Sequence, residues 1–315
     1  MKVAFVGGTR FIGRAAAQWA LAAGHDVVVL HRGVHGSAPP GAAVRIVDRS
    51  DAAALGRALA AERPDAVVDT RAMTRTDAEV AIEAMQGLGA AVVVLSSQDV
   101  YAQFGRLNGL PAPVPETVVT ESSPLTIPYP FRGKGHPAGD DYDKKDVERT
   151  YLDAAGRVFP RVTVLRLPAV YGRGDAARRF GAIVDAIDAG TTALPCRGGA
   201  SWRWTHAEVR DVAAAIGAAL SSRERGSAVY DVAEQWTPAM RERTESIARA
   251  MGRKVTWVET EEVPAELAIL GEMPCDFVVE GARIRRELGF REVTTEEQRV
   301  AELIAWLRES RVGIS

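Results

Sequence analysis

The chain begins, after Met1, with the stretch Lys2-Val3-Ala4-Phe5-Val6-Gly7-Gly8-Thr9-Arg10-Phe11-Ile12-Gly13. Its apolar first half predicts a short buried strand, and the glycine pair predicts a tight turn. Apolar residues then recur with helical spacing from about Ile12 to Ala23, before Gly24 and a second apolar run from Asp26 to Leu30. The start of the chain is therefore predicted to fold as a strand, a helix and a second strand.

The glycine-rich turn has the features that a dinucleotide pyrophosphate requires. Gly7 and Gly8 are free to take backbone angles closed to other residues, and they place no Cβ between the chain and a phosphate. Gly13 lets the helix lie close to the strand, and the first helix amides face the anion. We therefore expect a dinucleotide to be bound by the residues of this turn, which are Gly7, Gly8, Thr9, Arg10, Phe11, Ile12 and Gly13.

The end of the second strand indicates which dinucleotide binds. His31-Arg32-Gly33 occupies the place where an NAD site holds an acidic residue against the ribose 2′-hydroxyl. A guanidinium at Arg32, joined by Arg10 from the turn, would instead match a 2′-phosphate. The pattern favours NADP(H), with NAD as the alternative cofactor. The alternative interpretation is that both arginines are solvated surface charges.

A further candidate contact to the cofactor follows the apolar run from Val44 to Val47. There Asp48 could accept a hydrogen bond from the adenine amino group while Arg49 stacks on the ring. The alternative is that Asp48 only caps the helix predicted from about Ala52 to Ala61. The residues alone leave both interpretations open.

Short apolar runs alternate with helical segments along most of the chain. Runs at 2–6, 26–30, 44–47, 66–69, 91–95 and 162–167 predict parallel strands with helices on both faces, and a run at 228–232 predicts a strand that returns to the sheet. The fold class is therefore α/β, a doubly wound, Rossmann-like parallel sheet with a smaller C-terminal substrate lobe. We expect a nucleotide-binding domain at 1–167, with a return segment near 201–235, and a discontinuous lobe at 168–200 and 236–315.

Composition and charge argue against several classes of partner. The formal net charge of −2 over 315 residues provides no basic field for nucleic acid or an anionic membrane. No apolar run approaches the roughly 18 residues that cross a bilayer, and no leader precedes the first strand. Cys196 and Cys275 form no paired motif, which fits a reducing cytoplasm. We expect a cytoplasmic protein with a small-molecule substrate, no metal site, and a homodimer as the candidate assembly.

Two further segments lie where a substrate would bind. The fifth strand ends in Ser96-Ser97-Gln98-Asp99-Val100-Tyr101, and ligands of open α/β sheets gather at the carboxyl ends of strands, although such serines also commonly bond neighbouring backbone. From Phe104 to Pro137 the chain is rich in proline and glycine, and a loop of that length is usually functional or disordered. We interpret it as a lid with Arg132, Lys134 and His136 as candidate anion contacts, or as a solvated loop whose basic residues are incidental.

These stretches together resemble the extended short-chain dehydrogenase/reductases of the NAD-dependent epimerase/dehydratase family, over nearly the whole length. The likeness lies in the glycine turn, with Arg10 in place of its middle glycine, and in four other segments. They are Ser96-Ser97-x-x-Val100-Tyr101, Arg166-Leu167-Pro168-x-Val170-Tyr171-Gly172, His206-x-x-x-x-Asp211-Val212-Ala213 and Ala282-Arg283-x-x-x-x-Leu288-Gly289-Phe290. The resemblance implies a nicotinamide dinucleotide, with Pro168 among the residues beside it, and a nucleotide sugar or other small oxygenated substrate.

The resemblance also implies a catalytic set. In the family a serine or threonine positions the substrate oxygen, and a tyrosine four residues before a lysine moves the proton. Ser97 matches the serine and Lys144 best matches the lysine, but the residue four before Lys144 is Asp140. A phenol needs an adjacent cation to act as an acid or base at neutral pH, so the break in this pair matters for the chemistry.

Three interpretations of the break remain open. Tyr142 and Lys145 are three residues apart, so a shifted helix would still supply the pair from one face. Alternatively, Asp140 or Asp141 is the acid or base, which suits proton abstraction or elimination. In the third, the usual redox cycle is lost. The predicted function is an NADP(H)-dependent oxidoreductase, epimerase or dehydratase with an atypical site, and the alternative is a non-catalytic NADP(H)-binding redox sensor or regulator.

Overall fold

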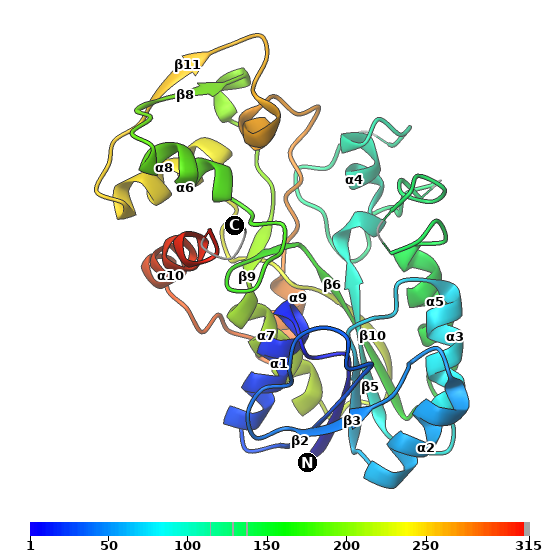
Figure 1. Ribbon diagram of the computed structural model, residues 1–315. Helices are drawn as coiled ribbons and strands as arrows, with labels where there is room; N and C mark the ends of the chain where they lie inside the picture. The colour runs from blue at the N-terminus through cyan, green and yellow to red at the C-terminus, as the bar shows by residue number, and fades with distance from the viewer. Residues whose placement is uncertain (114, 128, 137, 312–315) are drawn as a thin grey trace.

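The computed structural model describes residues 1–113, 115–127, 129–136 and 138–311. Its centre is a parallel sheet of seven strands in the order β10-β6-β5-β4-β1-β2-β3 (Figure 1). The strands are β1 (Lys2–Val6), β2 (Asp26–His31), β3 (Ala43–Ile46), β4 (Ala66–Asp69), β5 (Ala91–Ser97), β6 (Arg161–Leu167) and β10 (Gly226–Asp231). The predicted doubly wound sheet and its returning last strand are confirmed. The strand order reverses between β1 and β4, the position at which open α/β sheets bind dinucleotides.

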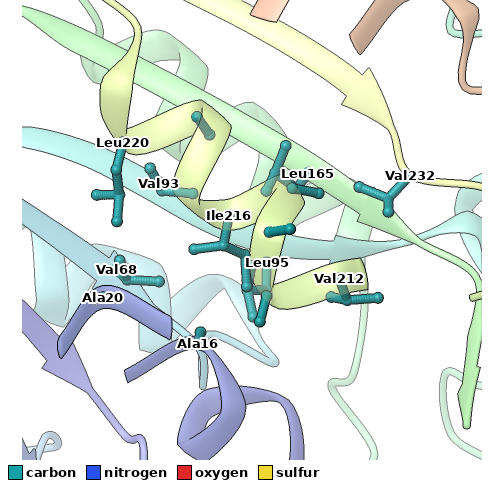
Figure 2. Packing of buried hydrophobic residues seen from close by; sticks show 14 of the residues in the cluster. Ala16, Ala20, Val68, Val93, Leu95, Leu165, Val212, Ile216, Leu220 and Val232 are labelled. Atoms are coloured by element: carbon teal, nitrogen blue, oxygen red, sulfur yellow. The ribbon is translucent and has the colours of Figure 1, made fainter. Parts of the chain in front are cut away.

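Helices cover both faces of the sheet, because successive strand residues point to opposite sides. Val3 and Phe5 of β1 are buried in the core that includes α1 and α7, while Ala4 and Val6 are buried with α2, α3 and α5. The helices are α1 (Phe11–Ala22), α7 (Val209–Ser221), α2 (Ala52–Glu62), α3 (Arg75–Ala84) and α5 (Lys144–Ala154). Figure 2 shows the first of these cores, where the small Ala16 and Ala20 of α1 meet the larger apolar residues of α7 and the sheet.

A smaller lobe stands above the carboxyl ends of the strands (Figure 1). It contains α6 (Gly181–Asp188), β8 (Ala193–Cys196), η2 (Gly198–Ala200), α8 (Met240–Ala250), β11 (Thr256–Glu259), η3 (Ala265–Leu270) and α10 (Glu296–Glu309). Its own core is made by apolar residues of those elements, among them Ile183, Leu194, Ile247, Leu270 and Leu307. Two short parallel pairs, β11 with β8 and β7 (Ala169–Tyr171) with β9 (His206–Glu208), complete the β-structure, and α9 (Ala282–Leu288) packs beside α7.

The long segment from 104 to 137 differs from the irregular lid that its composition predicts. Its first residues belong to a short helix, α4 (Ala102–Leu107), and residues 114, 128 and 137 lie outside the described part of the chain. The later part is fastened to the end of β5: the Ala102 amide donates to the Pro124 carbonyl and the Thr126 amide donates to the Val100 carbonyl, both at 2.8 Å. The described part of this segment is therefore hydrogen-bonded to the nucleotide-binding domain.

None of the helices in the described ranges is long and apolar enough to cross a membrane.

Candidate active site

The glycine turn between β1 and α1 is folded against the end of β4. Gly7 and Gly8 have φ angles of 94° and 112°, which side-chain-bearing residues rarely adopt. A Cβ on Gly7 would overlap the Thr70 hydroxyl, and a Cβ on Gly13 would lie 2.9 Å from the Cα of Gly8. The turn therefore keeps open a cradle that side chains would fill, and this cradle fits a pyrophosphate.

The first turn of α1 presents its amides to the same cradle. Arg10 precedes the helix without a side-chain capping bond, and no acidic residue stands in the first turn, all of which is described. Phe11 and Ile12 begin the helix, and Thr9 lies at the tip of the turn, where its carbonyl packs against Gly36. Helix N-terminal amides without acceptors carry the positive end of the helix dipole, so this end of α1 suits a phosphate.

Three exposed arginines belong to segments at or beside the turn: Arg10 lies in it, Arg71 follows β4, and Arg32 stands two residues after Leu30, whose carbonyl accepts from the Gly7 amide. Arg10 and Arg32 form no ion pair or side-chain hydrogen bond with any residue in the described ranges. Arg71 lies over the turn, because a Cβ on Gly7 would be 2.9 Å from its Cγ, and its guanidinium likewise has no acidic partner among the described residues. Arg71 belongs to no motif, and its place directly after β4 is the only signal that could have found it.

Asp48 and Arg49 follow β3 and have different partners. Asp48 is exposed, and its Oδ1 accepts from the amide and the hydroxyl of Ser50 at 2.9 and 2.8 Å, which holds the pKa of the carboxyl low. It does not cap α2, since Asp51 does, so the capping interpretation is wrong. The Arg49 guanidinium forms a two-point ion pair with Asp69 at 2.8 and 3.1 Å, which turns it away from a stacking role on adenine.

Beyond the carboxyl end of β5, the hydroxyls of Ser97 and Tyr142 lie around one buried carboxyl, that of Asp99. The Oγ of Ser97 accepts from the Asp99 amide at 3.3 Å, and the Tyr142 hydroxyl donates to Oδ2 of Asp99 at 3.0 Å. Oδ1 of Asp99 is buried and has no hydrogen-bond partner among the described residues. Burial raises the pKa of Asp99, so this carboxyl keeps its proton to a higher pH than an exposed aspartate does.

Lys144, the first residue of α5, lies at the same end of the sheet. Its buried Nζ donates to the carbonyls of Ala72 and Leu95 at 2.6 and 3.0 Å. Burial lowers the pKa of Lys144 to about 8, against the opposing effect of the Asp99 charge. The structure thus brings Lys144 close enough to Asp99 for the two charges to interact.

The helix that carries Lys144 begins only after Asp143. Asp143 is the N-cap, and its Oδ1 accepts from the Lys145 amide at 2.9 Å, so Tyr142 stands before the helix. The shared helix face proposed for Tyr142 and Lys145 is therefore wrong. Lys145 instead donates to the Thr126 carbonyl at 2.5 Å.

Asp140 and Asp141 lie in the turn before the N-cap, and both are exposed. Oδ1 of Asp140 accepts from the Gly135 amide at 3.0 Å. The carboxyl that meets Tyr142 is Asp99, so the proposal that Asp140 or Asp141 supplies the acid is not supported by their positions. Asp99 stands two residues after Ser97, and that spacing at a strand end was the available signal for it.

Tyr142 is held in its neutral form. Burial, and then the Asp99 charge, raise the pKa of its phenol, whereas an activated tyrosine base needs a lowered one. Its ring stacks on His136 with 3.9 Å between ring centroids. Tyr142 therefore differs in electrostatics as well as in spacing from the tyrosine that the resemblance implies.

The basic residues of the following loop have separate roles. Arg132 is closed by ion pairs to Asp143 and Asp146 at 2.8 and 2.7 Å, so it is not a free anion contact. His136 accepts at Nδ1 from the Ala138 amide at 3.1 Å, which places the proton of its neutral form on Nε2. Lys134 is exposed, and its role as an anion contact stays a prediction.

Pro168 lies at the same carboxyl edge of the sheet as Ser97, because it follows Leu167, which is paired in register with Ser97 across β5 and β6. It is half-buried between β6 and β7. Its contact with a cofactor stays a prediction.

A buried polar network supports the strand ends. Arg166 of β6 donates to Glu148 of α5 at 2.7 Å and to the Tyr101 hydroxyl at 2.9 Å, and Tyr101 donates to Asp231 of β10 at 2.5 Å. Glu148 also accepts from the Ser96 hydroxyl at 2.5 Å. The network joins β5, β6, β10 and α5 and so fixes the backbone from which Ser97 and Asp99 project.

A dinucleotide cradle thus lies at the reversal of strand order, and a serine, an acid, a tyrosine and a lysine lie beyond the strands next to it. The model of the NAD dependent epimerase/dehydratase family matches residues 3–233. The chain belongs to this family. Among the described residues, no group of three or more His, Cys, Asp or Glu side chains is arranged to hold a metal ion.

A curated relative and two solved structures illustrate this family membership. The 2′-dehydrokanamycin reductase of Streptomyces kanamyceticus is 29% identical, over 99% of this chain and 86% of that protein. UDP-glucose-4-epimerase of Stenotrophomonas maltophila, with bound NAD and formylated UDP-arabinopyranose, superposes with a TM-score of 0.77 at 17% identity, over 99% of each chain. MoeE5 in complex with UDP-glucose and NAD has a TM-score of 0.70 at 21% identity, over 99% of this chain and 100% of its own. The structural likenesses show the shared fold.

Proposed function

We propose that this epimerase/dehydratase-family protein is an NADP(H)-dependent oxidoreductase that reduces a carbonyl of a small oxygenated, sugar-like substrate. The observation that carries the proposal is the Tyr142–Asp99 hydrogen bond of 3.0 Å beside Ser97, beyond a glycine cradle ringed by unpaired arginines. The relative named as a reductase of a dehydrokanamycin supports reduction over epimerisation or elimination.

The cofactor end of the site fits a phosphorylated dinucleotide. Gly7, Gly8 and the amides of α1 would hold the pyrophosphate, while Arg32 and Arg10 would hold a 2′-phosphate by charge-assisted hydrogen bonds. Asp48 remains exposed at the end of β3 for the adenine amino group. When bound, the reduced nicotinamide supplies a hydride to the substrate carbon.

The substrate oxygen needs a proton, and the residues beyond β5 can deliver one. The Ser97 hydroxyl accepts from the Asp99 amide, which leaves its own proton free to position the substrate oxygen. The substrate oxygen would take the Tyr142 hydroxyl proton when Asp99 is protonated, because the carboxylic acid then donates to the phenol oxygen across the same 3.0 Å contact. The proton of Asp99 would restore the phenol, and the Asp99 carboxylate would be reprotonated from solvent. Because the pKa of Tyr142 is raised, no phenolate persists, and Asp99 with its raised pKa acts as the proton reserve. Lys144 would hold the nicotinamide ribose and limit the rise of the Asp99 pKa.

Exchange of Asp99 for asparagine tests this assignment. NADPH oxidation is followed with a panel of keto-sugars, free and nucleotide-linked, and kcat is compared between wild type, Asp99→Asn and Tyr142→Phe. Both variants should lose about 100-fold or more in kcat with unchanged NADPH affinity, because general acid catalysis contributes roughly that much. The exposed Asp140→Asn and Asp141→Asn are the matched controls, and we expect near-wild-type rates from them. Full activity in Asp99→Asn would remove Asp99 from the mechanism.

The second candidate function is non-catalytic NADP(H) binding, as a redox sensor or regulator. The broken tyrosine–lysine spacing and the raised pKa of Tyr142 favour it. Tight NADPH binding with no reduction of any keto-sugar in the panel would support this candidate over the enzyme. The cytoplasmic location, the homodimer and the boundaries of the two lobes stay predictions.

A further inference from the structure

We propose that the substrate of this site is a phosphate-free glycoside and not a nucleotide sugar. The inference rests on the proposed function, since it concerns the part of that same substrate that lies against the second lobe. It is carried by the ion pairs that several arginines of the second lobe form, because the arginines around the glycine turn form none with the described residues.

The second lobe meets the catalytic cluster along two segments, around Trp204 and Phe277. Phe277 packs on Phe104 of α4, with 5.6 Å between ring centroids, and its carbonyl accepts from the Thr205 amide at 3.0 Å. Trp204, Phe104 and Phe277 belong to or pack against the apolar cluster that also contains Tyr142. The side of the catalytic cluster that faces the second lobe is therefore lined by aromatic side chains.

The charged pair nearest to that wall is internally neutralised. Arg203 lies between Trp202 and Trp204, and its Nε donates to Oδ2 of Asp276 at 2.9 Å while its backbone amide donates to Oδ1 at 2.8 Å. The Asp276 carbonyl in turn accepts from Gln103 of α4 at 2.7 Å. Arg203 is thus fixed by a carboxylate at the point where the lobe meets the catalytic domain.

Four neighbouring arginines of the lobe also form ion pairs with carboxylates. Arg179 pairs with Asp175 at 2.8 Å, Arg178 with Asp185 at 3.2 Å, Arg197 with Glu272 at 3.2 Å, and the buried Arg243 with Glu234 at 2.8 Å. Arg241 donates to the Gly199 carbonyl at 2.8 Å and stacks on Trp257. In the four ion pairs the charge of the guanidinium is already balanced by a carboxylate, so a phosphate brought to any of them would add negative charge that no free cation offsets.

A diphosphate group carries several negative charges, and proteins hold such groups with convergent unpaired cations or backbone amides. The unpaired guanidiniums of Arg10, Arg32 and Arg71 belong to segments at or beside the glycine turn, where the cofactor phosphates are expected. Arg249 and Arg253, which are also unpaired among the described residues, stand at the C-terminal end of α8, whereas its first residue, Met240, bonds to the Trp202 carbonyl. The lobe offers aromatic faces and neutral ion pairs, which suit sugar rings or their amines and leave a diphosphate uncompensated. Lys134, exposed on the facing loop, is a single amine on a long stem.

The test is a calorimetric titration of UDP-glucose into the full-length protein, with and without NADPH. We expect no binding by wild type up to millimolar concentration. Asp276→Asn keeps an oxygen acceptor for the Arg203 amide but frees the guanidinium, so it should gain at least about tenfold in affinity for UDP-glucose. Adding Arg203→Gln to that variant should abolish the gain.

Glu272→Gln is the matched control, because it frees Arg197 in an exposed pair that does not contact α4, and no gain is expected from it. Asp276→Ser serves as a second variant if the asparagine form is unstable in a thermal melt. Micromolar binding of UDP-glucose by wild type, or no gain in either Asp276 variant, would overturn the proposal. The titration of UDP-glucose without cofactor shows whether UDP-glucose binds independently of NADPH. A failure of NADPH to bind is a separate result, and it would overturn the proposed function.

Discussion

A single β-carbon at Gly7 decides whether the cofactor turn can form. Gly7 combines a φ of 94° with a position at which a Cβ would overlap Thr70 and approach Arg71 to 2.9 Å. We expect Gly7→Ala to lower the free energy of unfolding by about 3 kcal/mol or more and to abolish NADPH binding, because backbone strain and steric overlap add. Urea denaturation and NADPH titration measure the two effects.

Gly24 provides the matched control for that substitution. Its φ is 80°, but nothing lies within 4 Å of an added Cβ, so Gly24→Ala pays for strain alone. We expect a loss of about 1 kcal/mol and unchanged NADPH affinity. Equal losses in the two variants would show that the contacts around Gly7 do not constrain the turn.

Asp231 makes stability depend on pH. Burial, with the nearby Glu121 as a further cause, raises the pKa of this carboxyl to about 8. Between about pH 4 and pH 8 the folded protein holds a proton that the unfolded chain releases, so stability falls as pH rises through this window, by at most about 1.4 kcal/mol per unit. Asp231→Asn replaces the carboxyl with a group that does not titrate. The unfolding free energy of wild type, taken relative to this variant, should therefore fall as pH rises through the same window.

Denaturant melts at several pH values measure that difference. Asp141→Asn, at an exposed position, is the control and should follow wild type at every pH. Parallel curves for wild type and Asp231→Asn would mean that Asp231 is ionised in the folded protein.

At the scale of elements, the packing of α1 on α7 includes one especially close approach. The indole of Trp19 lies against Gly217, where a Cβ would overlap the ring. Gly217→Ala gains about 1 kcal/mol of helix propensity, but the overlap costs more, so we expect a net loss of about 1–2 kcal/mol in unfolding free energy.

This packing is tested by whether the effect of Gly217→Ala on the unfolding free energy changes sign when Trp19 is replaced. In a Trp19→Leu background the overlap is gone, and Gly217→Ala should then stabilise by up to about 1 kcal/mol. Destabilisation of the same size in both backgrounds would contradict the contact. Because α1 carries the amides of the cofactor cradle, we also expect weaker NADPH binding in Gly217→Ala alone.

Helices and strands could be predicted from the sequence where a single pattern, such as a continuous apolar run, specifies them. The buried strands of the sheet are continuous apolar runs, and each was placed within a few residues of its observed ends. The start of α5 was not, because Asp140, Asp141 and Asp143 are all acceptable caps in sequence and only the fold selects Asp143. The same ambiguity separates Asp48 from Asp51 at α2. Short α4, next to a proline-rich loop, has too few residues for a periodic signal.

At the scale of the whole molecule, the two ends of the site differ in how far the sequence specifies them. The glycine turn is contiguous, so its conformation follows from local residues. The proposed proton-transfer end brings together Ser97, Asp99 and Tyr142 across a long loop, and no local spacing predicts which aspartate meets the phenol. Arg71 reaches the turn only because β4 lies beside β1. Sheet topology therefore decides what the motifs leave open.

The pairing of charges also has a pattern that extends over the molecule. Unpaired guanidiniums stand at the glycine turn, while those of the second lobe named above are bound to carboxylates or to carbonyl and ring partners. We propose from this distribution that phosphate groups are recognised at the cofactor end, and a 2′-phosphate on the dinucleotide is the central claim of that proposal.

Calorimetric titration of the wild-type protein and of Arg32→Ala with NADPH and NADH tests that claim most directly. We predict that wild type binds NADPH at least about tenfold more tightly than NADH, since a charge-assisted contact to the 2′-phosphate contributes roughly 1.5–3 kcal/mol. Arg32→Ala should lose most of this preference while keeping its NADH affinity. Equal affinities in wild type, or a preference for NADH, would contradict the account.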